Sequence, residues 1–122
     1  MEKTIDFLKK VQTFYLGTVD GDMPRIRPFG AVTEYERRLY FSTSNTKDVF
    51  KQVMKNPNVC VVACCGRSWI RIQGIAKRDT RTAVKQRMLD DNPVLTNSKR
   101  FNGVDDPKFE VFGIDNMKVE SY

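Results

Sequence analysis

Hydrophobic residues recur at helical spacing in three segments of the chain. Thr4 can cap the first helix, and Ser44-Asn45-Thr46 precede the second, which is expected to stop at Asn56-Pro57. The third extends from Thr80 to Asp91. The residues expected to face the core are, in chain order, Ile5, Phe7, Leu8 and Val11; Val49, Phe50, Val53 and Met54; Val84 and Met88. The pattern predicts two or three short helices.

The remaining segments read mostly as strands separated by turns. Seven strands are predicted, over residues 14–19, 24–35, 38–43, 59–65, 68–78, 109–114 and 117–121. Asp115-Asn116 is interpreted as the turn of a closing hairpin, and residues 94–106 as a long loop. The run 59–65 is almost continuously apolar, as in a central strand covered on both faces. Many antiparallel strands with few helices favour a mainly β barrel, closed to protect its edges.

Length and composition indicate one domain over residues 1–122. The chain has 40% hydrophobic residues, enough for a single core without a metal or disulfides. It contains no histidine. Catalysis by Ser/His/Asp or Cys/His groups, histidine acid/base chemistry and histidine-ligated metals are therefore excluded within the chain.

The charge balance favours an anionic partner. Lys plus Arg number 21 against 15 Asp plus Glu, giving a net charge of +6 and an isoelectric point near 9.4. The charged N-terminal segment and the lack of a long apolar run predict a cytoplasmic protein without a membrane span. The three cysteines, Cys60, Cys64 and Cys65, do not fit a secreted disulfide framework or a metal site and are expected to be buried thiols.

The segment Pro24-Arg25-Ile26-Arg27-Pro28-Phe29-Gly30 is the first candidate site. In a strand, Arg25, Arg27 and Phe29 share one face, while Pro28 and Gly30 mark an edge or a bulge. Two guanidinium groups beside exposed backbone would suit an anion or a flat ring. The alternative is a solvated strand face in which proline blunts an edge.

The segment Phe41-Ser42-Thr43-Ser44-Asn45-Thr46-Lys47 is the second candidate site. Here a strand runs through small polar residues into the start of a helix, so hydroxyl groups, free backbone amides and the Lys47 ammonium would converge. That arrangement suits a phosphate group. The alternative is ordinary helix capping with Lys47 in water.

The order of these motifs resembles one known family. R-x-R-P-F-G, a strand ending F-S-T, a polar turn with Lys47, an N-P pair, an apolar strand and W-I-R-I-Q-G-I-A together look like the pyridoxamine 5′-phosphate oxidase-like FMN-binding split β-barrel, over about residues 4–91. The resemblance implies a homodimer with FMN at the subunit interface. It is closest to the small general-stress and nitroimidazole-reductase-like members.

The resemblance also implies roles for particular residues. Residues 25–30 (Arg25, Ile26, Arg27, Pro28, Phe29 and Gly30) would line the flavin ring and ribityl chain, with Arg25 or Arg27 reaching the phosphate. Ser42 and Thr43 would bond flavin or ribityl oxygens, Thr46 and Lys47 would hold the phosphate, and Trp69 would contact the flavin. Lys99, Arg100, Phe101 and Phe112 are candidates to cover the exposed flavin face. Because the family's oxidase uses an Arg-x-His element that is missing here, pyridoxamine phosphate oxidation is not expected.

The functional hypothesis is therefore an FMN-dependent oxidoreductase that transfers electrons from a reduced nucleotide or partner to a small planar acceptor. Two alternatives remain open at the level of sequence. The protein could be a non-catalytic flavin-binding sensor or electron carrier. It could also be a basic β-barrel that binds nucleic acid through a stacking groove formed by Tyr40, Arg67, Trp69, Arg71, Lys77 and Arg78.

Overall fold

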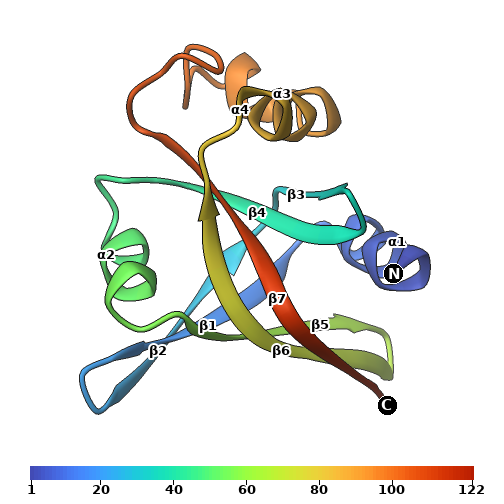
Figure 1. Ribbon diagram of the computed structural model, residues 1–122. Helices are drawn as coiled ribbons and strands as arrows, with labels where there is room; N and C mark the ends of the chain where they lie inside the picture. Colours follow the sequence, from blue (N-terminus) through green and yellow to red (C-terminus); the bar gives the residue numbers. More distant parts are fainter.

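The computed structural model describes residues 1–122 and shows seven strands and four short helices (Figure 1). In chain order the elements are α1 (Glu2–Val11), β1 (Phe14–Asp20), β2 (Met23–Phe29), β3 (Val32–Tyr35), β4 (Arg38–Ser44), α2 (Asp48–Lys55), β5 (Asn58–Cys65), β6 (Ser68–Asp79), α3 (Thr82–Asp91), α4 (Val94–Asn97) and β7 (Phe109–Ser121). No helix combines the length and the apolar character needed to cross a bilayer.

All neighbouring strands of the sheet are antiparallel, in the order β2-β1-β5-β6-β7-β4-β3. The two edge strands, β2 and β3, are consecutive in the chain, and only Gly30 and Ala31 separate them. A link this short between opposite edges forces the sheet to curl round on itself, but β2 and β3 do not pair. The barrel is therefore split along one side, whereas the strand pattern alone had favoured a closed one.

Two predicted strand boundaries differ in the structure. The expected strand 24–35 breaks at Gly30-Ala31, because the chain must leave one edge of the sheet for the other. The expected closing hairpin is one strand, β7, in which Asn116 adopts a positive φ of 53°. Between Gln73 and Ile75 of β6 the pairing shifts, and β7 carries one extra residue there. The Asp115-Asn116 signal thus marks a β-bulge, since asparagine tolerates left-handed backbone in a bulge as it does in a turn.

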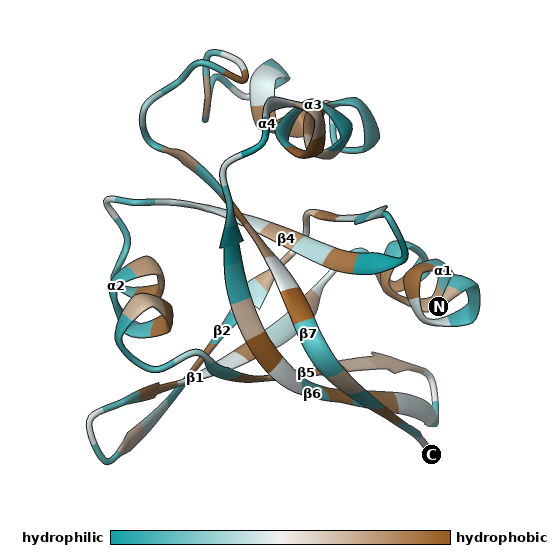
Figure 2. Ribbon diagram, viewed as in Figure 1, coloured by the Kyte–Doolittle hydropathy of each residue, from teal (hydrophilic) through white to brown (hydrophobic).

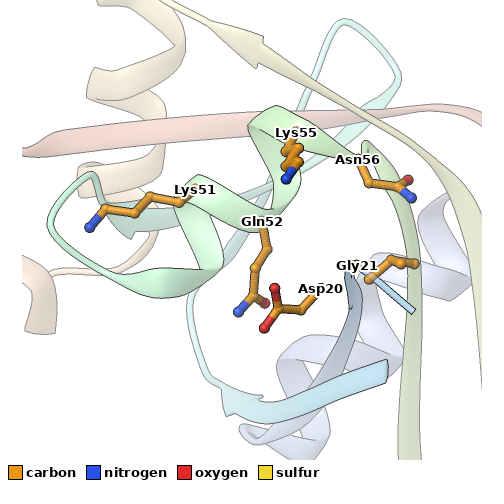
Figure 3. Close-up of a pocket in the computed structure, with 7 residues that line it drawn as sticks. Asp20, Gly21, Lys51, Gln52, Lys55 and Asn56 are labelled. Atoms are coloured by element: carbon orange, nitrogen blue, oxygen red, sulfur yellow. The ribbon is translucent and has the colours of Figure 1, made fainter. Parts of the chain in front are cut away.

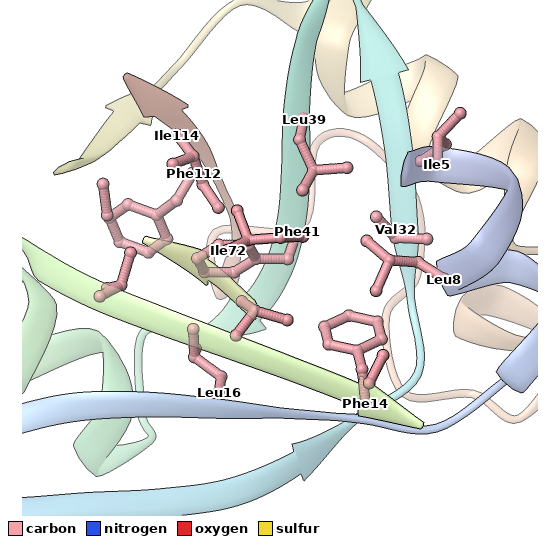
Figure 4. Packing of buried hydrophobic residues seen from close by; sticks show 14 of the residues in the cluster. Ile5, Leu8, Phe14, Leu16, Val32, Leu39, Phe41, Ile72, Phe112 and Ile114 are labelled. Atoms are coloured by element: carbon pink, nitrogen blue, oxygen red, sulfur yellow. The ribbon is translucent and has the colours of Figure 1, made fainter. Parts of the chain in front are cut away.

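Hydrophobic side chains form two cores. The larger cluster, of 17 buried residues, fills the barrel and includes Leu16, Phe41, Ile72 and Phe112 (Figure 4). The smaller cluster, of nine residues, lies where α3 packs against β3, β4, β7 and α4. The alternation of hydrophobic and hydrophilic positions along β6 and β7 is visible in Figure 2.

The helices keep their predicted inner faces but not their predicted caps. Ile5, Leu8, Val49, Val53, Val84 and Met88 are buried, whereas Met54 is 51% exposed. The helices α1, α2 and α3 begin after Met1, Lys47 and Arg81, and none of these has a side-chain cap hydrogen bond. The expected loop 94–106 contains the one-turn helix α4 and is anchored by buried Leu95 and Phe101.

Strand β5 is covered on one face only. Val59, Val61 and Ala63 point into the barrel, whereas Cys60 and Val62 are half-buried and Cys64 is exposed. The expectation of a strand covered on both faces is therefore wrong for the isolated chain. The same geometry overturns the expectation of buried thiols, because Cys60 and Cys64 lie on the open face and Cys65, at the end of the strand, is half-buried.

A polar network ties the end of β6 to β4 and α3. The Arg81 guanidinium and the Tyr40 hydroxyl, at 2.8 Å each, donate hydrogen bonds to Asp79, which also accepts one from the Arg81 backbone. The bonds from the Arg81 side chain outweigh the opposing effect of burial and lower the pKa of Asp79 to about 2. The ionised carboxylate thus contributes to the stability of the fold.

This network predicts a specific loss of stability in acid. An unfolded aspartate has a pKa near 3.9, so the stabilisation by Asp79 is complete above that value and is lost as the pH falls toward 2. Urea unfolding at pH 5 and pH 3 should therefore show a smaller loss of stability in Asp79→Asn than in the wild type. Asp105→Asn is the control, because the Asp105 side chain is exposed and makes no hydrogen bond, and it should follow the wild type. Equal losses in wild type and Asp79→Asn would contradict the assignment.

Candidate functional site

A cleft of about 1380 Å³ opens along the split in the barrel. Its walls come from β2, the end of β4, the start of α2 and the α4 segment. Nine of the eleven residues predicted to bind a cofactor line it: Arg25, Ile26, Arg27, Pro28, Phe29, Gly30, Ser42, Thr43 and Lys47. The two candidate segments therefore do meet in one place, as the sequence suggested.

The strand edges that border the cleft carry unpaired backbone groups. Strand β2 pairs only with β1, and its other edge is free. The pairing of β3 with β4 ends at Phe41, so Ser42, Thr43 and Ser44 pair only with β7 on their far side. Free N–H and C=O groups on both sides of the split can bond the polar rim of a flat ligand.

Arg27 joins three elements beside the cleft. Its guanidinium donates hydrogen bonds to the carbonyl of Leu16 (3.1 Å), the hydroxyl of Thr18 (2.8 Å) and Oε1 of Gln52 (2.7 Å). Burial and the charge of Arg25 lower the pKa of Arg27, while Asp48 acts in the opposite direction. An arginine has five N–H donors, so two remain available for a ligand. Arg25, by contrast, is exposed and paired with Asp20 at 3.3 Å.

The start of α2 presents free amides to the same cleft. Lys47 is the residue before the helix, and the backbone N–H groups of Asp48 and Val49 have no hydrogen-bond partner. No carboxylate lies within ion-pair distance of the Lys47 ammonium. Thr46 does not line the cleft, and its side chain bonds Ser44 Oγ at 2.7 Å. The helix dipole, two free amides and an unpaired cation are groups that suit an anion at this end of the cleft.

A buried carboxylate holds the turn before α2 in place. Glu110 on β7 accepts hydrogen bonds from Asn45 Nδ2 (3.0 Å) and from two nitrogens of Arg78 (2.8 and 3.0 Å). Burial opposes ionisation of Glu110, but the bonds from Arg78 and Asn45 outweigh it and leave the pKa of Glu110 lowered. Asn45 also donates to the carbonyls of Pro107 and, through its backbone, Lys108. Lys47 thus follows a turn that hydrogen bonds hold to β7 and to the segment before it.

Several predicted residues lie elsewhere. Phe29 lines the cleft, but its ring packs against Phe14 and Phe41 of the core. Trp69 is outside the cleft of its own chain, stacked on Tyr122 at a centroid distance of 4.2 Å. Of the four residues proposed to cover a flavin, Arg100 and Phe101 line the cleft, but Phe101 is buried against Phe109. Phe112 belongs to the barrel core, and Lys99 does not reach the cleft.

Sequence reasoning missed two residues that organise the site. Thr18 is buried on β1 and donates to Gln52 Oε1 at 2.7 Å. Gln52 follows Asp48 by one helical turn, a spacing that places both on the same side of α2 and could have been noticed. A smaller hollow of about 280 Å³ adjoins the cleft, and both Gln52 and Asp20 border it (Figure 3).

The predicted nucleic-acid groove does not assemble. Tyr40 is fully buried, and Arg78 is paired with Glu110 at 2.8 Å. Arg71 lies over the Trp69 and Tyr122 rings and pairs with Glu120 at 3.6 Å. These side chains are engaged in contacts within the protein, and they do not form a row of exposed stacking platforms.

Comparison with known proteins agrees with this architecture. Residues 1–121 match the family model described as pyridoxamine 5′-phosphate oxidase. The chain belongs to that family. A NimC/NimA family protein from Clostridium acetobutylicum is 40% identical, with a TM-score of 0.92 over 100% of this chain and 86% of the other. No curated protein sequence matches the chain.

More distant members share the fold. General stress protein 26 from Bacillus anthracis is 22% identical, with a TM-score of 0.77 over 98% of this chain and 91% of the other. HutZ, the heme storage protein from Vibrio cholerae, is 12% identical, with a TM-score of 0.73 over 98% and 92%. Members of the family commonly bind flavin or heme cofactors. The split barrel predicted from the order of motifs is thus confirmed.

Proposed function

We propose that the protein is an FMN-binding oxidoreductase that acts on a small planar electron acceptor. The observation that carries this proposal is the composition of the cleft. One end offers an unpaired lysine and two free helix amides, and the walls offer two unpaired strand edges. A ligand with a phosphate at one end and a flat ring with polar edges at the other fits this set of groups.

Each part of the cleft then has a role. Lys47 and the amides of Asp48 and Val49 hold the phosphate. Arg27 has two free N–H donors and lies close enough to the start of α2 for its guanidinium charge to interact with the Asp48 carboxylate. Residues 25–30 and the Ser42-Thr43 segment line the ring and its sugar-alcohol chain. The carboxylate of Asp48 lowers the net positive charge of the cleft. With no histidine in the chain, a histidine-held heme does not fit.

A bound flavin would supply the redox chemistry, a two-electron transfer from a reduced nucleotide or partner to the acceptor. The protein needs no general base for this. Its own residues would bind the phosphate and would offer hydrogen-bond partners to the edges of the ring. We place the protein in the cytoplasm, where its three free thiols would stay reduced.

We also propose that two copies associate through the open face of β1, β2, β5 and β6. This face carries a group of apolar side chains that are exposed or half-buried: Tyr15, Ile26, Cys60, Val62, Cys64 and Trp69. Ile26 is 73% exposed and also lines the cleft, so the face and the cleft are continuous. Exposed apolar patches of this kind mark protein interfaces. If Trp69 contacts FMN, it does so from the second copy, because it lies outside its own cleft.

Replacing Ile26 by serine should weaken this association. An isoleucine that becomes buried on dimerisation contributes about 1.5 to 3 kcal/mol, so the dimer dissociation constant should rise at least about tenfold. Sedimentation over a concentration series would measure it. Met54→Ser is the control, because Met54 is a similarly exposed apolar residue on α2, away from this face. A monomeric wild type, or equal effects of both substitutions, would refute the proposed interface.

The visible absorption spectrum tests the function directly. Purified protein, incubated with FMN and then desalted, should keep the flavin bands, and a reductant should bleach them. A small planar acceptor should restore the bands over repeated cycles. Retention of flavin without turnover would instead identify an electron carrier or sensor. A protein that stays colourless would exclude flavin binding, and salt-dependent oligonucleotide binding would then be measured.

A further inference from the structure

The cleft contains, besides Lys47, a second cation without a partner. Arg100 lines the cleft from the segment after α4, whereas Lys47 lies directly before α2. Of the other two cleft arginines, Arg25 is paired with Asp20, and Arg27 uses three of its five donors within the protein. Arg100 makes no ion pair and no side-chain hydrogen bond. Its five donors are all available to a ligand.

The backbone around Arg100 is fixed. The N–H of Phe101 donates to the carbonyl of Leu95 at 2.9 Å, and the Phe101 ring is buried against Phe109 at a centroid distance of 4.7 Å. On the other side, the Lys99 N–H donates to the Thr96 carbonyl at 2.9 Å. Arg100 therefore extends from an anchored position on the cleft wall, although its side chain is exposed.

Another exposed residue of the cleft wall is apolar. Val94 lines the same cleft and is 57% exposed. The cleft, at about 1380 Å³, is also larger than the range of roughly 300 to 1,000 Å³ that single small ligands usually occupy. A bound cofactor would therefore leave room for a second molecule at the α4 segment, where the apolar Val94 and the free guanidinium of Arg100 line the cleft.

We infer that Arg100 recognises an anionic group on the acceptor, so that the preferred substrates are flat aromatic acids. This inference rests on the proposed function, because it assigns the part of the cleft that FMN does not fill. A guanidinium binds a carboxylate through two parallel hydrogen bonds, which an uncharged analogue cannot reproduce equally well. Val94 would contact the aromatic ring.

The test compares two probes of the same shape. FMN-loaded protein is titrated by calorimetry with para-nitrobenzoate and with its neutral isostere, para-nitrobenzamide. We expect the wild type to prefer the acid about tenfold, and Arg100→Gln to abolish that preference. Lys99→Gln is the matched control. It removes the same charge at the neighbouring position, and the Lys99 side chain does not line the cleft.

Three results would overturn the inference: no preference in the wild type, a preference that survives in Arg100→Gln, or an equal loss in Lys99→Gln, which would indicate a diffuse charge effect. FMN affinity is measured for all three proteins beforehand. If the wild type does not bind FMN, the proposed function fails and this inference fails with it. If FMN binds but the acid is not preferred, only the assignment of Arg100 is wrong.

Discussion

Replacing Lys47 by glutamine should raise the dissociation constant for FMN roughly 10- to 150-fold. The change removes the unpaired ammonium beside the free amides of Asp48 and Val49, and a charge-assisted hydrogen bond to phosphate contributes about 1.5 to 3 kcal/mol. The helix amides remain, so binding should be weakened and not abolished. Titration of flavin fluorescence at fixed ionic strength measures the constant.

Lys55→Gln is the control for this experiment. It removes the same charge from the last turn of the same helix, and Lys55 does not line the cleft. Its FMN affinity should stay within about twofold of the wild type, because solvent screens an exposed charge at that distance. If Lys47→Gln binds FMN as tightly as the wild type, the phosphate lies elsewhere in the cleft. Riboflavin, which lacks the phosphate, should not distinguish Lys47→Gln from the wild type.

Replacing Gly74 by alanine should destabilise the fold by about 3 kcal/mol. Gly74 lies opposite the bulge in β7, and a Cβ there would come within 2.3 Å of Ile114 Cγ2 and 2.7 Å of the Asp115 carbonyl oxygen. The backbone contact cannot be relieved by a side-chain rotation, so β6 and β7 must separate locally. The midpoint of thermal unfolding should fall by roughly 10 °C.

Gly103→Ala separates this clash from a general effect of removing glycine. A Cβ at Gly103 meets no atom within 4 Å, and its φ is not positive. The stability of Gly103→Ala should therefore stay within about 0.5 kcal/mol of the wild type or rise slightly, because alanine restricts the unfolded chain. Equal unfolding midpoints for the two variants would show that the bulge accommodates a methyl group.

The strand count illustrates how far a sequence pattern reaches. Seven strands were predicted and seven are present. However, the predicted strand 24–35 is divided into β2 and β3, and the predicted strands 109–114 and 117–121 form the single strand β7. The predicted strand 24–35 is two strands because β2 pairs with β1 whereas β3 pairs with β4, and these pairings lie at opposite ends of the sheet. At Asp115-Asn116 a turn-like pair lies inside a strand, because left-handed backbone serves a bulge as well as a turn.

The candidate site shows the same division. The hydroxyl-rich strand end and Lys47 could be recognised as an anion-binding segment, since helix termini have free amides wherever they occur. The partners of Arg27 could not be recognised, because Leu16, Thr18 and Gln52 come from two other elements. The sequence pattern gave no specific role to Arg100. The structure suggests one, because Arg100 lines the cleft and forms no ion pair.

The sequence by itself determined which helix faces are buried, that the sheet is antiparallel and which two segments carry the candidate cofactor groups. These are local properties, encoded by spacing and residue type over a few turns or strand repeats. The tertiary structure decided that β2 and β3 become opposite edges, that the cleft opens between β2 and the end of β4, and that Trp69 lies outside it. Those outcomes depend on pairing between strands far apart in the chain, which local spacing does not specify.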